Sequence, residues 1–127
     1  MPRFVILFHQ LPAGSSRAAH WDLMLERDGS LMTWAISEAL EPDRSIDAEQ
    51  LPNHRVAYLD YEGPVSENRG SVSRWDCGTY TLIAQTDDLL QVDLAGHRCR
   101  GELLLEKAPS APTQSWRARL SSLRPEA

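Results

Sequence analysis

Short apolar or alternating runs, separated by turn residues, dominate the chain and predict a protein built from β-strands. Phe4 to His9 is a continuous apolar run that ends on a polar residue, which is typical of a buried strand. His20 to Glu26 predicts a second strand. Asp28-Gly29 is a strong hairpin signal and leads into a third strand from Leu31 to Ile36. The first part of the chain therefore predicts antiparallel strands.

The rest of the chain also predicts short strands separated by turns and loops. Glu38 to Gln50 is polar and contains Pro42, which predicts a loop with at most a short helix around Ala48. Cys77-Gly78 predicts a turn, and Arg124 to Ala127 a fraying tail. No long helical period occurs. The expected fold is mostly β: a compact β-barrel of about seven to eight short antiparallel strands with flanking loops and at most short helices. The further strands are predicted over Arg55–Glu62, Ser71–Asp76, Tyr80–Ala84, Leu89–Leu94, Gly101–Lys107 and Trp116–Leu120.

Length, composition and charge limit the number of domains and the kinds of partner that the chain can have. The chain has 127 residues, which fits one domain spanning residues 1–127, since domains typically have ~100–150 residues. Apolar residues make up 42% of the chain, which argues against wholesale disorder. The formal net charge is −5, so the chain as a whole does not attract nucleic acid. Any such contact must come from a local basic patch.

The cysteines and the first strand indicate a cellular compartment. Cys77 and Cys99 are the two cysteines, and without a secretion signal they predict free thiols rather than a disulfide framework. The apolar run from Phe4 to Phe8 is too short for a membrane span and lacks the features of a signal peptide. We therefore expect a cytoplasmic monomer that does not contact a membrane.

The run His20-Trp21-Asp22 carries the clearest candidate chemistry. Side chains alternate along a strand, so His20 and Asp22 project from the same face. Imidazole and carboxylate together suit Mn²⁺, Zn²⁺ or Fe²⁺. His9, at the polar end of the first strand, is the natural third ligand. The spacing alone leaves a second interpretation open, because a histidine beside a carboxylate is often only a satisfied hydrogen bond.

His54 and Tyr58 form a second candidate group. In an extended strand they would share a face at a separation of about 13 Å. A protonated histidine and a tyrosine hydroxyl are both good donors to a phosphate. The alternative is that Tyr58 packs at a sheet edge and His54 is a loop residue.

Several segments, in order, resemble one known family. His20 to Glu26, followed by Asp28-Gly29 and Trp34-Ala35-Ile36, resembles the phosphoesterase domain of bacterial DNA ligase D, in which the corresponding strand reads His-Tyr-Asp-x-Arg-x-Glu. His54-x-x-x-Tyr58 with Asp60 to Gly63, and Trp75-Asp76-x-Gly78-x-Tyr80, resemble further segments of that family. The similarity extends over nearly the whole chain.

The resemblance implies a compact β-barrel and a metal-dependent phosphoesterase, with Mn²⁺ as the expected cofactor and Zn²⁺ as the alternative. Such an enzyme removes a terminal ribonucleoside and then the 3′-phosphate from nucleic-acid ends, leaving a 3′-hydroxyl for DNA end repair. Carried over to this chain, the resemblance makes His9, His20 and Asp22 the metal ligands. It makes His54 and Tyr58 the catalytic contacts to the scissile phosphate. The implied partners are nucleic-acid 3′ ends, bound through a local site, and a ligase or polymerase.

Two departures from the family pattern leave alternatives open. Met24 stands where the family has an arginine that grips the phosphate, and a thioether cannot replace that charge. Pro52 replaces an acidic residue. Arg44 and Arg69 are candidates for a compensating cation. The alternatives are a catalytically weakened module that binds metal or nucleic-acid ends, and a phosphoesterase that acts on another phosphate ester.

Overall fold

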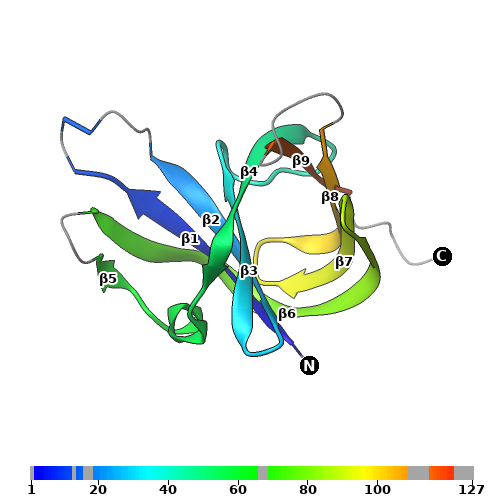
Figure 1. Ribbon diagram of the computed structural model, residues 1–127, viewed down its shortest axis with the longest axis horizontal. Coiled ribbons are helices and arrows are strands. Elements are labelled where there is room, and N and C mark those ends of the chain that lie inside the picture. The colour runs from blue at the N-terminus through cyan, green and yellow to red at the C-terminus, as the bar shows by residue number, and fades with distance from the viewer. Residues whose placement is uncertain (1, 13, 16–18, 66–68, 109–114, 122–127) are drawn as a thin grey trace.

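Nine strands pair into one antiparallel sheet in the computed structural model (Figure 1), which describes residues 2–12, 14–15, 19–65, 69–108 and 115–121. The mostly β, antiparallel class is therefore confirmed, with nine described strands where seven to eight were expected. The predicted tail, Arg124 to Ala127, lies outside the described residues. The strands are β1 (Arg3–Gln10), β2 (His20–Arg27), β3 (Ser30–Ile36), β4 (Ser45–His54), β5 (Gly63–Pro64), β6 (Ser71–Thr86), β7 (Leu89–Gly96), β8 (Arg100–Lys107) and β9 (Ser115–Leu120).

The sheet closes on itself through its longest strand. The strand order is β1-β2-β3-β4-β9-β8-β7-β6-β5, and β6 also pairs with β1. β6 is 16 residues long, so its first part pairs with β1 and its later part with β7. The short β5 adds to the start of β6, outside this ring. Closure leaves the ring without the unpaired edges that invite aggregation.

The predicted loop from Glu38 to Gln50 was wrong over its second half, which belongs to β4. Ile46 and Ala48 are buried and alternate with exposed residues, which is the pattern of a strand with one face in the core. The small Ala48 and the polar neighbours hid this alternation in the sequence. No helix forms around Ala48.

The predicted strand over Arg55 to Glu62 was also wrong. Its first half is a 3-10 helix, η1 (Val56–Leu59), which directly follows β4 and contacts β1. Leu59 is its buried residue. Within the residues that the structure describes, no helix is long and apolar enough to cross a membrane.

The predicted turn at Cys77-Gly78 does not form, because β6 continues through it. A Cβ atom at Gly78 would lie 2.1 Å from the carbonyl oxygen of Ala95 on β7. Glycine is therefore required here by the close approach of the neighbouring strand and does not mark a turn.

Asp76 organises the turn between β7 and β8. Its carboxylate accepts hydrogen bonds from the backbone N–H groups of His97, Arg98 and Cys99 at 2.8–3.0 Å. Asp76 therefore holds a turn that lies about twenty residues further along the chain. Cys77 and Cys99 are free thiols, as predicted. Burial, reinforced by the charge of Asp76, raises the pKa of Cys99 to about 12.

Two apolar clusters lie on opposite faces of β1 and β2. Phe4 and Ile6 of β1 pack in the larger cluster together with Leu23 and Leu25 of β2. This is why β1 is apolar at successive positions: both of its faces are covered. Each large buried side chain contributes about 1.5–3 kcal/mol relative to an exposed one. The second cluster, which we call the outer apolar cluster, consists of Val5, Leu7, Met24, Leu31, Leu59 and Val72.

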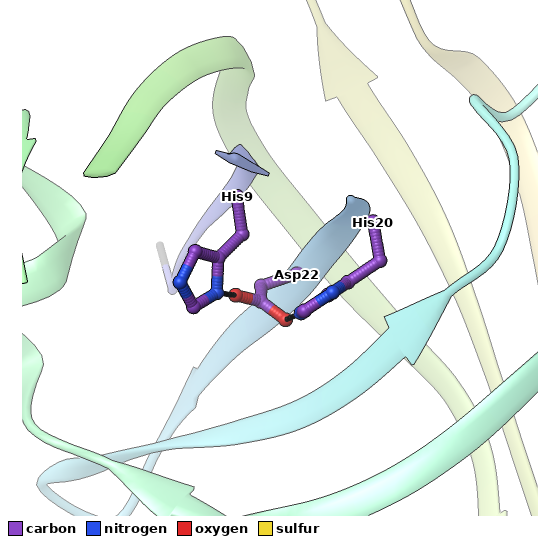
Figure 2. A group of neighbouring side chains, drawn as sticks. All are labelled: His9, His20 and Asp22. Carbon is purple, nitrogen blue, oxygen red and sulfur yellow. Dashed lines mark hydrogen bonds and ion pairs between the residues drawn. The ribbon is translucent and has the colours of Figure 1, made fainter. Parts of the chain in front are cut away.

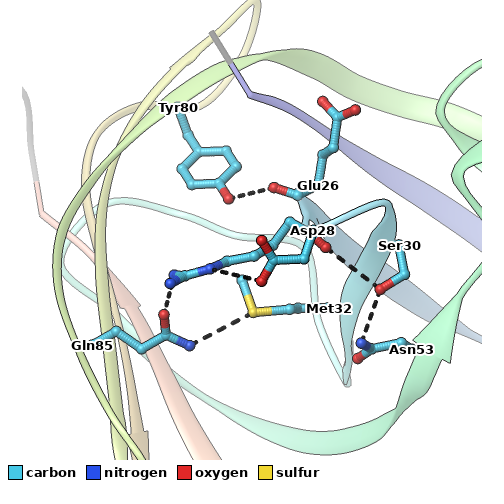
Figure 3. Close-up of polar contacts among 8 residues, drawn as sticks. Glu26, Asp28, Ser30, Met32, Asn53, Tyr80 and Gln85 are labelled. Carbon is cyan, nitrogen blue, oxygen red and sulfur yellow. Dashed lines mark hydrogen bonds and ion pairs between the residues drawn. The ribbon is translucent and has the colours of Figure 1, made fainter.

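The β2–β3 hairpin fixes the strand that carries the candidate chemistry. Asp28-Gly29 has φ values of 52° and 82°, as a type I′ turn requires. Figure 3 shows how this hairpin is tied to other strands. The Tyr80 hydroxyl of β6 donates to the backbone oxygen of Glu26 at 2.6 Å, and the Asn53 amide of β4 donates to Ser30 Oγ at 3.0 Å. The hairpin is thereby anchored to β6 through β2 and to β4 through β3.

Candidate metal centre

The pairing of β1 and β2 brings three polar side chains together. His9 and His20 are direct partners in the antiparallel register, and Asp22 is opposite Leu7. Strand alternation places all of these residues on the face of the outer apolar cluster, since Leu7 belongs to that cluster. The polar group therefore begins where the apolar cluster ends. These are the three residues that the sequence predicts as metal ligands.

Asp22 lies between the two imidazole rings (Figure 2). Its Oδ2 is 3.2 Å from His9 Nδ1, and its Oδ1 is 3.0 Å from His20 Nε2. The ring centroids of the two histidines are 4.9 Å apart. One ligand atom from each of the three residues lies within 4.8 Å of the others, which is close enough for one cation to contact all three.

The hydrogen bond from His9 to Arg69 fixes the tautomer of this histidine. His9 Nε2 is 2.7 Å from the carbonyl oxygen of Arg69. A carbonyl oxygen only accepts, so Nε2 carries the proton. Nδ1, the nitrogen that faces Asp22, then either carries a second proton or offers a lone pair to a cation. A ligating histidine whose other nitrogen donates to a backbone carbonyl is the usual arrangement in metal sites.

Asp22 is buried and charged. Burial raises its pKa, but hydrogen bonds from His20 and then His9 outweigh that effect, so the pKa of Asp22 lies below its usual range. Within the described part of the chain, the one polar partner of Asp22 Oδ1 is His20 Nε2, at 3.0 Å. A buried carboxylate oxygen that lacks a full set of partners, beside two imidazoles, fits a divalent cation.

A pocket of about 570 Å³ opens in front of these three residues. His54, at the end of β4, and Tyr58, in η1, line the same pocket. Their ring centroids are only 5.9 Å apart because the chain turns into η1 instead of extending as a strand, in which they would be about 13 Å apart. The structure thus brings all five candidate residues of the sequence analysis to one pocket.

Pro52 orients His54 through its backbone. His54 Nδ1 is 2.9 Å from the carbonyl oxygen of Pro52, so Nδ1 donates and Nε2 is left to act on a ligand. Position 52, where the sequence analysis noted the loss of an acidic residue, therefore still supplies an oxygen to this histidine. Sequence reasoning missed this role, since every residue carries the same carbonyl group.

Met24 removes the family arginine, but another arginine lies at the pocket. Met24 lines the pocket but is 1% exposed and packs in the outer apolar cluster. Arg69 is exposed and lines the same pocket. Arg44 forms ion pairs with Glu38 and Glu41 and is not among the residues that line it. Of the two arginines singled out in the sequence, Arg69 is the one beside the candidate site.

Most of the chain matches a known protein family. Residues 13–107 match the family described as the DNA Ligase D 3′-phosphoesterase domain. This range contains His20, Asp22, His54 and Tyr58, whereas His9 precedes it. The assignment of His9 to the site therefore depends on the geometry described above.

The chain also resembles curated multifunctional proteins. It is 33% identical over 111 residues to the multifunctional non-homologous end joining protein LigD of Mycobacterium bovis, a match that covers 80% of this chain. It is 36% identical over 69 residues to the protein of the same name from Pseudomonas aeruginosa, covering 50% of this chain. The matches span 14% and 8% of the lengths of those two relatives. The chain belongs to the DNA ligase D 3′-phosphoesterase domain family.

Proposed function

We propose that this protein is a metal-dependent phosphoesterase that removes 3′-phosphate or 3′-ribonucleoside groups from nucleic-acid ends in DNA end repair. The observation that carries the proposal is that two groups of side chains line the same pocket. His9, His20 and Asp22 form a candidate metal site, and His54 and Tyr58 supply donors for a phosphate. The printed names of the relatives, which refer to non-homologous end joining, support a role at DNA ends.

The proposed metal ligands are His9 Nδ1, His20 Nε2 and a carboxylate oxygen of Asp22. Two imidazoles and one carboxylate suit Mn²⁺, our first choice, and also Zn²⁺. A divalent ion held by these residues would supply Lewis-acid polarisation of a phosphoryl oxygen. The low pKa of Asp22 keeps this ligand charged at neutral pH.

His54 and Tyr58 are proposed to act on the phosphate directly. The Pro52 carbonyl holds the Nδ1 proton of His54, so Nε2 is the atom that donates to the phosphate or exchanges a proton with it. The Tyr58 hydroxyl is a neutral donor beside it. Arg69, on the rim of the pocket, is proposed to supply the positive charge that Met24 does not.

The chemistry of the product implies a partner. Removal of a 3′-phosphate leaves a 3′-hydroxyl, which a ligase or a polymerase needs as its substrate. We propose that such an activity acts on the ends that this protein prepares.

A second candidate function is a module that binds metal and nucleic-acid ends without cleaving them. A related alternative is an enzyme that cleaves another phosphate ester. The observation that favours both is the burial of Met24, because the position of the family arginine has become part of an apolar cluster. Losing one charge-assisted contact of this kind typically costs ~10²–10³ in rate.

The two candidates are separated by an assay on a primer-template whose primer ends in a 3′-phosphate. With Mn²⁺ present, the phosphoesterase proposal expects release of inorganic phosphate that His20→Ala abolishes. Arg44→Ala, a change outside the pocket, should leave the rate unchanged. If the wild-type protein releases no more phosphate than His20→Ala, the phosphoesterase proposal is wrong. Mn²⁺ binding would then favour the binding module.

A further inference from the structure

A second, smaller hollow lies beside the pocket of the metal centre and shares two of its walls. It has a volume of about 230 Å³, and Tyr58 and Val65 line both cavities. The two cavities are therefore adjacent, on either side of Tyr58 and Val65. The residues that line the hollow are Arg55, Ala57, Tyr58, Tyr61, Pro64 and Val65.

Two tyrosine rings form a corner in this hollow. The rings of Tyr58 and Tyr61 are 5.8 Å apart between centroids and meet at 89°. Tyr61 is 37% exposed and is one of three exposed large apolar side chains among the described residues. Its hydroxyl donates to the carbonyl oxygen of Pro64, so the ring is held in place before any ligand arrives. An exposed and pre-ordered aromatic face is what a stacking platform for a flat ring requires.

Arg55 adds a cation at the hollow. It is exposed and precedes η1 as its N-cap residue. Within the described residues it forms no ion pair, whereas Arg3 pairs at 2.7 Å with Asp60, the C-cap residue at the other end of the same helix. An arginine without an acidic neighbour can stack on a base or contact a phosphate.

We propose that this hollow is a nucleobase subsite, which receives the base of the nucleotide whose 3′-phosphate occupies the larger pocket. This inference rests on the proposed function, because that function places a nucleotide phosphate beside Tyr58. The volume is below the ~300–1,000 Å³ of pockets for drug-sized ligands, which suits a single ring system. Stacking is tolerant of base identity, so the subsite selects for the presence of a terminal base and not for its sequence.

The test measures binding separately from turnover. The probes are 5′-fluorescent oligonucleotides ending in a 3′-methylene phosphonate, which keeps the charge but lacks the scissile bond. One probe carries a base on its last nucleotide and the other is abasic there. With Mn²⁺ present, we expect the wild-type protein to bind the first probe roughly 5- to 150-fold more tightly, the range that one base–aromatic stack provides.

Two substitutions at one position assign the effect to the ring. Tyr61→Leu should abolish the preference for the base. Tyr61→Phe should keep it, although both variants lose the hydroxyl that donates to Pro64. Equal affinity of the wild-type protein for the two probes, binding of neither, or an undiminished preference in Tyr61→Leu would each overturn the subsite.

The phosphate-release assay distinguishes this failure from that of the proposed function. Phosphate release without any preference for the base removes the subsite and leaves the phosphoesterase. A preference for the base without phosphate release removes the phosphoesterase and leaves the subsite.

Discussion

His9 Nε2 donates a 2.7 Å hydrogen bond to the backbone oxygen of Arg69, a residue 60 positions further along the chain. The next residue, Gly70, is held as well, since its backbone oxygen accepts a hydrogen bond from the N–H of Val65 at 2.8 Å. The bond from His9 to Arg69 fixes which nitrogen of His9 faces Asp22. The backbone carbonyl of residue 69 therefore orients a proposed metal ligand.

Gly70 is the residue that lets this segment approach β1, and it provides the first prediction. Its φ is +88°, and a Cβ atom there would lie 2.0 Å from the backbone oxygen of Gln10. Gly70→Ala should therefore displace the Arg69 carbonyl and weaken Mn²⁺ binding about 10- to 100-fold, as losses of outer-shell partners do. Isothermal titration calorimetry measures this affinity.

Gly29 provides the matched control. Its φ is +82°, but a Cβ atom there would meet nothing within 4 Å. Gly29→Ala introduces the same backbone strain without a collision and far from the pocket, so its Mn²⁺ affinity should match that of the wild-type protein. Equal affinities for Gly70→Ala and Gly29→Ala would show that the Arg69 carbonyl does not support the site.

The second prediction concerns the dependence of stability on pH. The pKa of Asp22 is lowered in the folded protein, so its charged form stabilises folding above the unfolded pKa of ~3.9, and this contribution is lost as the pH falls through the lower, folded value. Asp22→Asn removes charge-assisted hydrogen bonds and should destabilise the metal-free protein by about 1.5–3 kcal/mol at pH 7. Urea unfolding at a series of pH values measures the difference.

The difference between wild type and Asp22→Asn should shrink in acid. Asp47→Asn is a suitable control, because the Asp47 carboxylate is largely exposed and its ion pair with Arg117 is long, at 3.7 Å. It should change the stability little at any pH. A destabilisation by Asp22→Asn that stays constant down to pH 3 would contradict the assignment of the effect to the carboxylate.

The local sequence pattern was sufficient to predict the two strands that hold the proposed metal ligands. Phe4 to His9, His20 to Glu26 and the Asp28-Gly29 turn were placed correctly, because hydrophobic pattern and turn chemistry agree there. The same-face placement of His20 and Asp22 follows from strand geometry alone. The position of His9, the proposed third ligand, required only the antiparallel pairing of the two strands.

Other parts of the site depend on contacts that the sequence does not display. The closeness of His54 and Tyr58 results from a 3-10 helix whose N-cap residue, Arg55, makes no side-chain capping hydrogen bond, so no capping motif predicts it from the sequence. The contact between His9 and Arg69 joins backbone to side chain across a long stretch of chain. Gly78 resembled a turn residue because a close approach of strands and a turn both select glycine.

The third prediction tests the basic rim of the pocket. Arg69 lines the pocket, whereas Arg44 is engaged with Glu38 and Glu41 outside it. Arg69→Ala should raise KM for a 3′-phosphate primer-template about tenfold, since a charge-assisted contact to an anion contributes on the order of 1.5–3 kcal/mol when well formed. Arg44→Ala should leave KM unchanged. Steady-state kinetics measure both, and an equal response of the two variants would remove Arg69 from the site.

The fourth prediction restores the family arginine. Met24 lines the pocket, so the guanidinium of Met24→Arg can reach the phosphate while its stem stays in the outer apolar cluster. We expect this variant to raise kcat for phosphate release by up to ~10²-fold, since such a donor acts mainly on charge that develops in the transition state. Its free energy of unfolding should fall, because a charged group replaces a side chain that is 1% exposed. Met24→Leu, which keeps the apolar volume, should change neither quantity appreciably. A Met24→Arg protein that stays folded and binds Mn²⁺, yet gains no rate, would show that the charge at this position does not limit the reaction.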